Sequence, residues 1–272
     1  MNPYHTNLEH LQSEFQNGHD LSFVSSYPRS GNTWARHLIA DVFLQNAGME
    51  TQTELPVHPD QLIPDVHSND VRQQDAELVH GHRIVKSHDT INQISDLFGE
   101  GAYQRIQHLY LVREPVDALV SYYHFHLRYD ALKDQVADGV DSFCLRKLDS
   151  WLQHTDEALT HHRLGGRIFI QSYEQLLRSP EQSLTSMLSW LAIESSPEQI
   201  ARAVSHMQFS NLRKKESKNP ANPNEYFFRK GVVGSGEDEL KPPTIETIRE
   251  RAASTLESLD WLRVLSSELA TR

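Results

Sequence analysis

Hydrogen-bond donors of several kinds lie together in one short segment, Tyr27-Pro28-Arg29-Ser30-Gly31-Asn32-Thr33-Trp34. Arg29 offers a planar, permanently charged fork of donors, and the hydroxyl groups of Ser30 and Thr33 can donate further hydrogen bonds. A turn that contains Gly31 and leads into a helix points backbone N–H groups and the positive helix end at one spot. The segment therefore predicts a binding site for a phosphate or a sulfonate.

A second candidate anion site lies about eighty residues further along the chain. Arg113 directly follows an apolar run, and Ser121 comes about two turns into the helix predicted at 115–128. Both can reach the carboxyl edge of a sheet, where α/β folds bind their ligands. The alternative is that Arg113 forms a structural ion pair with Glu114 or Asp117.

Two further segments carry charge and a proton-transfer group. Lys86-Ser87-His88 ends a predicted strand, and alternate strand residues share a face, so Lys86 and His88 can point to one place. Such a histidine can take a proton from a hydroxyl, and the lysine can stabilise charge on a transferred group. A histidine that only caps the strand end is the alternative.

A fourth motif lies near the end of the long loop: Arg229-Lys230-Gly231 could bind a phosphate with two cations and a backbone N–H.

Predicted strands alternate with predicted helices along the chain, which indicates a central parallel sheet covered by helices on both faces. The strands are predicted at 21–27, 82–86, 105–112 and 167–171, and the helices at 32–46, 115–128, 143–161, 180–192, 197–204 and 244–267. Polar or proline- and glycine-rich segments at 48–79, 129–142 and 211–243 interrupt the alternation as long loops. Without a repeat or an obvious linker, residues 1–272 are predicted to form one α/β domain.

Composition excludes several classes of protein. Lys and Arg number 26 against 37 Asp and Glu, and the net charge of −11 argues against a nucleic-acid partner. No apolar run approaches the ~20 residues needed to span a bilayer, and the N-terminal residues lack a signal-peptide core. The single cysteine, Cys144, fits a reducing compartment as a packed thiol. We therefore expect a cytoplasmic protein without a membrane partner. The histidines lack a metal-site pattern, so no metal is expected.

The four motifs, in this order, resemble those of the sulfotransferases that use 3′-phosphoadenosine-5′-phosphosulfate (PAPS). The chain looks like a bacterial-like member of the cytosolic type, and the resemblance extends over about residues 21–236. It implies a P-loop-kinase-like sulfotransferase fold. It also implies in-line transfer of a sulfonyl group from PAPS to a hydroxyl of a small-molecule acceptor, with 3′,5′-ADP as product and no metal.

The resemblance also implies roles for individual residues. His88 would be the catalytic base, while Arg29 and Lys86 would stabilise charge on the transferred group. The cofactor-binding residues would be Arg29, Ser30, Gly31, Asn32 and Thr33 at the 5′ end, Arg113, Ser121, Arg229, Lys230 and Gly231 at the 3′-phosphate, and Trp34, Tyr173 and Phe209 around the adenine.

Three departures from the family pattern limit what is carried over. Arg29 stands where cytosolic members commonly have lysine, and it can only act electrostatically because arginine does not give up its proton. Met207 stands where the family often has threonine, which puts one nucleotide hydrogen bond in doubt. The family's dimer segment is missing after Gly231, so the oligomeric state is left open.

The sequence leaves two alternative functions open. A nucleotide kinase that uses ATP and Mg²⁺ would need a loop lysine and a strand-end aspartate, where this chain has Asn32 and Arg113. A non-catalytic nucleotide sensor would not need Lys86 and His88. The acceptor pocket is expected to involve 48–79, 123–142 and 211–228, with Tyr122, Tyr123, Phe125 and Tyr129 as aromatic candidates beside their ordinary packing roles.

Overall fold

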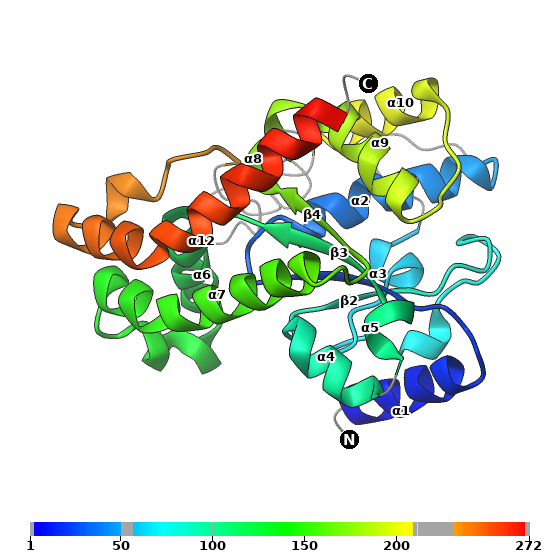
Figure 1. The fold of residues 1–272 in the computed structure, drawn as a ribbon, viewed down its shortest axis with the longest axis horizontal. Coiled ribbons are helices and arrows are strands. Elements are labelled where there is room, and N and C mark those ends of the chain that lie inside the picture. Colours follow the sequence, from blue (N-terminus) through cyan, green and yellow to red (C-terminus); the bar gives the residue numbers. More distant parts are fainter. Residues whose placement is uncertain (1–2, 50–56, 100, 209–210, 212–230, 270–272) are drawn as a thin grey trace.

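A four-stranded parallel sheet forms the centre of the molecule (Figure 1). The structure, a computed structural model, describes residues 3–49, 57–99, 101–208, 211 and 231–269, with the side chains left out at 261–269. The strands are β1 (Ser22–Ser26), β2 (Ile84–Ser87), β3 (Gln107–Val112) and β4 (Ile168–Ser172), in the order β2-β1-β3-β4. The predicted fold class, a parallel α/β sheet flanked by helices, is confirmed.

The register brings the carboxyl ends of three strands to one edge of the sheet. Val24 of β1 pairs with Lys86 of β2, and Ser26 pairs with Leu111 of β3. The ends of these strands, and the turns that follow them, therefore lie side by side. Parallel strands covered on both faces need nearly continuous apolar runs, and β3 is buried over five of its six residues.

Helices cover both faces of the sheet. They are α1 (Pro3–Gln16), α2 (Asn32–Asn46), α3 (Pro59–Leu62), α4 (Ile91–Phe98), α5 (Ala102–Arg105), α6 (Pro115–Arg128), α7 (Val140–Arg163), α8 (Tyr173–Arg178), α9 (Pro180–Trp190), α10 (Pro197–His206) and α12 (Pro242–Leu269). Short 3₁₀ helices occur at η1 (Val71–Gln73), η2 (Asp130–Val136) and η4 (Glu237–Glu239). Among the helices that the structure describes, none combines the length and the hydropathy of a membrane span.

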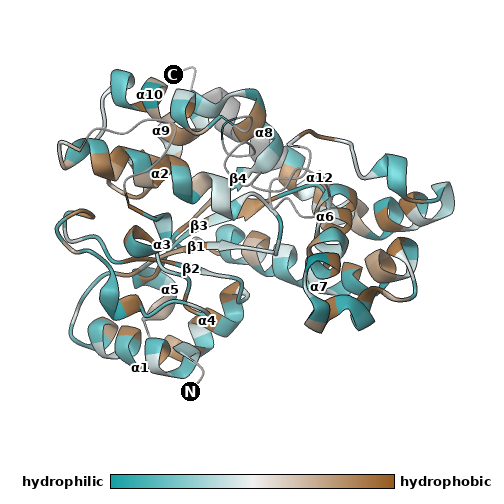
Figure 2. Ribbon diagram, turned by 180° about the vertical axis from the view of Figure 1, so that it is seen from behind, coloured by the Kyte–Doolittle hydropathy of each residue, from teal (hydrophilic) through white to brown (hydrophobic). Residues whose placement is uncertain are grey.

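The two faces of β3 belong to different parts of the core. Leu109 and Leu111 pack with α2, α9 and α10, whereas Tyr110 and Val112 pack with α6, α7 and α12. Such alternation follows from the two-residue period of a strand. In Figure 2 the central strands carry hydrophobic residues mixed with polar ones, whereas the outer turns of α1 and α10 are mainly hydrophilic. The sheet is thereby fixed from both sides, which gives its edge a stable geometry.

The observed helix bounds agree best with the predicted ones where a glycine or a proline marks the start of the helix. Helices α2 and α6 have the predicted bounds, because a glycine precedes the first and a proline opens the second. Helices α1, α4, α5 and α8 were not predicted. Within the long loop predicted at 48–79, residues 57–79 are more ordered than expected, since they hold α3, η1 and an isolated bridge to β2.

Candidate active site

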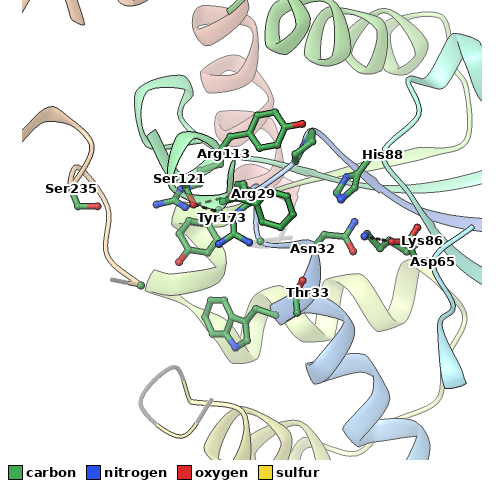
Figure 3. A pocket seen from close by; sticks show the side chains of 16 residues that line it. Arg29, Asn32, Thr33, Asp65, Lys86, His88, Arg113, Ser121, Tyr173 and Ser235 are labelled. Atoms are coloured by element: carbon green, nitrogen blue, oxygen red, sulfur yellow. Dashed lines mark hydrogen bonds and ion pairs between the residues drawn. The ribbon is translucent and has the colours of Figure 1, made fainter. Parts of the chain in front are cut away.

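A cavity of about 310 Å³ lies at the carboxyl edge of the sheet (Figure 3). The predicted site residues that line it are Arg29, Gly31, Asn32, Thr33, Trp34, Lys86, His88, Arg113, Ser121, Tyr173 and Gly231. Pro28, Asp65, Tyr122, Phe125 and Ser235 also line it. Figure 3 shows Arg29, Ser121 and Tyr173 grouped at one end of the cavity and Lys86, Asp65 and His88 at the other. Phe209, Arg229 and Lys230 lie outside the described residues.

The loop between β1 and α2 has a backbone that a side chain at residue 31 would disturb. Gly31 is left-handed, with φ 96°, and a Cβ there would come within 2.6 Å of the Tyr173 ring. Arg29 is also left-handed, with φ 71°, a conformation uncommon outside glycine and typical of functional loops. No side chain in the described part of the chain caps the start of α2, so its first N–H groups can face an anion.

Of two loop residues predicted to bind the cofactor, Asn32 lines the cavity and Ser30 does not. The Asn32 side chain donates from Nδ2 to the Val24 carbonyl, 3.0 Å away, and to Ser26 Oγ, 3.2 Å away. It therefore braces the loop against β1. Ser30 is fully buried and does not line the cavity, and its Oγ lacks a hydrogen-bond partner among the described residues. Sequence spacing could not reveal which way either side chain turns.

His88 has the tautomer that a general base requires. Its Nδ1 lies 2.7 Å from the Ser26 carbonyl oxygen. Because a carbonyl only accepts, Nδ1 carries the proton and Nε2 is the acceptor nitrogen of the neutral ring. Burial, and then the nearby Lys86 charge, hold the pKa of His88 well below its ordinary value. The ring is therefore neutral at pH 7 and able to accept a proton.

Lys86 lines the cavity next to His88 and is bound to a carboxylate that sequence reasoning missed. Lys86 Nζ lies 2.5 Å from Asp65 Oδ2. Burial lowers the pKa of Lys86, and Asp65 opposes that shift. Asp65 falls in the segment predicted to be a loop, and a lone acidic residue after a proline carries no specific signal. Only the fold brings it to β2.

The two arginines of the cavity lie close together. Arg29 Nε donates to Ser121 Oγ at 3.2 Å, which joins the two predicted anion sites. The guanidinium of Arg113 lies 4.4 Å from the centre of the Tyr173 ring, within range of a cation–π contact. Arg113 also forms an ion pair with Asp117, with Nη2 and Oδ2 3.5 Å apart. This is one of the structural ion pairs that the sequence offered as the alternative role of Arg113. It does so while lining the cavity, so the two interpretations are compatible.

Asp117 fastens the segment after Gly231 to α6. Its carboxylate accepts hydrogen bonds from the N–H groups of Gly234, at 2.8 Å, and Gly236, at 2.7 Å. A Cβ at Gly236 would come within 2.9 Å of the Val116 carbonyl oxygen, so this approach requires glycine. The anchoring holds Gly231 at the cavity, directly after Arg229 and Lys230 in the sequence.

Aromatic side chains form another wall of the cavity. Trp34 packs edge-on against Tyr173, with ring centres 6.2 Å apart, and its Nε1 donates to the Met207 carbonyl at 2.8 Å. The Met207 side chain is fully buried in the core, so Met207 meets this wall through its backbone. Tyr122 and Phe125 line the cavity as the acceptor hypothesis expected.

The remaining sequence hypotheses concern residues away from the cavity. Tyr123 packs on Phe143 in the core, and Tyr129 is 45% exposed. Cys144 is buried, and burial raises the pKa of its thiol to about 12, as expected of a packed thiol. Among the described residues, no cluster of three or more His, Cys, Asp or Glu side chains could hold a metal ion.

Comparison with known proteins gives consistent similarities. A family model described as "Sulfotransferase domain" matches residues 19–260. Sulfotransferase 1E1 of Bos taurus is 25% identical over 241 residues, which cover 83% of this chain and 79% of the relative. Sulfotransferase 1B1 of Mus musculus is 25% identical over 249 residues, covering 84% and 79%.

Solved structures share the fold. Mouse sulfotransferase SULT7A1 complexed with PAP aligns with a TM-score of 0.66 at 19% identity, over 98% of this chain and 95% of that one. Retinol dehydratase in complex with androsterone and inactive cofactor PAP aligns with a TM-score of 0.58 at 18% identity, over 93% and 85%.

Proposed function

The chain belongs to the sulfotransferase family, and on that premise we propose that it transfers a sulfonyl group from PAPS to a hydroxyl of a small-molecule acceptor, with His88 as base. The observation that carries the proposal is the pairing of His88 and Lys86 at one end of a cavity whose other end carries Arg29, Ser121 and Arg113. A proton acceptor thus shares one cavity with groups suited to bind two anionic ends of a nucleotide.

The residues present fit PAPS by their chemistry. Three cationic side chains, Arg29, Lys86 and Arg113, line one cavity of a chain whose net charge is −11. Gly31 leaves room for the Tyr173 ring beside the loop. Arg113 Nε is buried without a hydrogen-bond partner among the described residues, as a donor reserved for a ligand would be. Two of the similar solved structures contain PAP, which supports the same nucleotide here.

Residues of this chain would assist transfer in three ways. His88 Nε2 accepts the hydroxyl proton while the acceptor oxygen forms its bond to sulfur. Arg29 and Lys86 stabilise the negative charge that develops as the sulfur–oxygen bond to the nucleotide breaks. The N-terminus of α2, with Thr33, holds the 5′ end, while Arg113 and Ser121, with Arg229, Lys230 and Gly231, hold the 3′-phosphate. PAPS supplies the sulfonyl group and leaves as 3′,5′-ADP.

A nucleotide kinase fits the same cavity less well. Its loop would need a lysine at position 32, where Asn32 instead braces β1. Asp65, an acidic residue in the cavity that could otherwise hold a metal ion, is bound to Lys86.

We also propose that residues 1–272 form a single sulfotransferase domain.

The acceptor class is tested by incubating the protein with labelled PAPS and a panel of phenols, alcohols, sugars and amines. We expect the labelled sulfonyl group to appear on the hydroxyl compounds.

Activity is expected to persist into mildly acidic solution. A base works in its unprotonated form, and a lowered pKa moves its protonation to more acidic pH. We therefore expect kcat/KM for the acceptor to stay level as pH falls from 8 through 6, and to drop only in more acidic solution. Initial rates at saturating PAPS across this range measure it. A fall centred near the ordinary histidine pKa of about 6.5 would contradict the environment described for His88.

A further inference from the structure

Asp65 meets the end of β2 from a segment outside the four sequence motifs. Its carboxylate lies 2.5 Å from Lys86 Nζ, and both side chains line the cavity (Figure 3). We propose that Asp65 is a positioning residue that keeps the Lys86 ammonium charged and directed at the transferred group. The proposal rests on the proposed function, in which Lys86 stabilises developing charge.

Backbone hydrogen bonds place Asp65 beside Lys86. The Lys86 N–H donates to the Pro64 carbonyl at 2.8 Å, and the Val66 N–H donates to the Lys86 carbonyl at 3.0 Å. Asp65 and Lys86 are thus partners in a parallel bridge on the outer edge of β2. The side chains of paired residues on neighbouring strands lie on the same face. The backbone pairing therefore places the Asp65 side chain on the same face of the sheet as the Lys86 side chain.

The segment that carries Asp65 is fixed in turn by its own polar contacts. The His67 N–H donates to Asp65 Oδ1 at 3.1 Å, and the Asp65 N–H donates to Asn69 Oδ1 at 2.9 Å. From α1, the Asn7 side chain donates to the Val66 carbonyl at 2.8 Å. With Oδ1 held by the His67 N–H, the other carboxylate oxygen, Oδ2, faces Lys86 Nζ. Such support of a functional group by its neighbours is what pre-organises an active site.

The surroundings of Lys86 make its charge depend on this partner. Each side chain of the Asp65–Lys86 pair is only 12% exposed, so solvent gives the ammonium little help. Among the described residues, the other charged or titratable groups around it are His88, His67 and the Arg36–Asp60 ion pair, in which Arg36 Nη1 lies 2.6 Å from Asp60 Oδ1. Burial and the Arg36 charge lower the pKa of Lys86, whereas Asp65 and, to a smaller extent, Asp60 raise it. Without Asp65, burial would favour the neutral amine, which cannot stabilise negative charge.

The test is the Asp65→Asn variant, which keeps the shape of the side chain and removes its charge. An opposite charge within 4–6 Å shifts a pKa by about 1–3 units. We therefore expect the alkaline loss of kcat to move down by about 1–3 pH units, with 3′,5′-ADP affinity at pH 6 unchanged. Asp70→Asn is the matched control, because Asp70 lies in the same segment but pairs with exposed Arg72. Its pH profile should equal that of the wild type.

A second variant identifies the titrating group. Arginine stays charged at all these pH values, so Asp65→Asn combined with Lys86→Arg should lack the new alkaline limb, whatever its absolute rate. Persistence of that limb in the double variant would overturn the proposal, because another group would then be titrating. An Asp65→Asn profile identical to the wild type would overturn it as well.

A direct titration separates this proposal from the proposed function. With lysine labelled by ¹³C at Cε, the Lys86 resonance is the one missing from the Lys86→Arg spectrum, and its pH midpoint should fall in Asp65→Asn. An unchanged midpoint would refute the role of Asp65 even in an active enzyme. If the wild type binds 3′,5′-ADP but turns over no PAPS, the proposed function fails, while this titration still decides whether Asp65 maintains the lysine charge.

Discussion

Replacing His88 with alanine is expected to lower kcat by about 10²–10⁴-fold, the usual effect of losing a positioned base. The affinity for 3′,5′-ADP should stay near that of the wild type, because His88 lies at the opposite end of the cavity from Arg113 and Ser121. The loss of kcat is expected because the hydrogen bond from His88 Nδ1 to the Ser26 carbonyl leaves Nε2 as the nitrogen that accepts the hydroxyl proton. Steady-state kinetics and calorimetry measure the two quantities separately.

His124→Ala is the matched control for this variant. His124 lies on α6, its Nε2 is 2.5 Å from Glu239, and it does not line the cavity. It should retain nearly the wild-type kcat. Near-normal turnover in His88→Ala, with loss in His124→Ala, would show that the base has been assigned to the wrong histidine.

The second large effect concerns the 3′-phosphate. We expect 3′,5′-ADP to bind more tightly than 5′-AMP by several kcal/mol, since each charge-assisted hydrogen bond contributes ~1.5–3 kcal/mol. Arg113 is nearly buried and beside Ser121 at the same end of the cavity, so it should supply a large share of this difference. Arg113→Ala should weaken 3′,5′-ADP binding about 10–100-fold and change 5′-AMP binding much less.

Titration calorimetry with both nucleotides measures this discrimination. Arg72→Ala is a suitable control, because it also removes an arginine but from an exposed pair with Asp70. It should preserve the preference for 3′,5′-ADP. Equal affinities for the two nucleotides in the wild type would remove the basis for a 3′-phosphate site at Arg113.

The sequence predicted the elements of the site better than its internal contacts. Gly31 and Pro115 mark the starts of α2 and α6, so the helices that carry Thr33 and Ser121 could be located to the residue. Apolar runs located the central strands to within about two residues. These signals are local, so they can be recognised in one sequence without knowledge of the contacts in the fold.

Other features depend on contacts that no local pattern encodes. Asp65 and Lys86 are 21 residues apart in the sequence and meet through a bridge to β2, and the segment around Asp65 shows no strand periodicity. The direction of the Asn32 amide is set by carbonyl and hydroxyl groups of β1. Helix α4 was overlooked although Thr90 and Gln93 form a capping box at its start, a signal that could have been read.

The central claim is donor-dependent sulfonyl transfer, and one turnover assay tests it most directly. The purified chain is incubated with PAPS or with ATP and Mg²⁺, with and without a hydroxyl acceptor, and both nucleotide and acceptor products are quantified. The account predicts 3′,5′-ADP and sulfated acceptor in equal amounts from PAPS, only when acceptor is present, and no phosphorylated product from ATP. Phosphorylated acceptor from ATP, or tight binding of 3′,5′-ADP with no sulfated product from any hydroxyl compound, would contradict it.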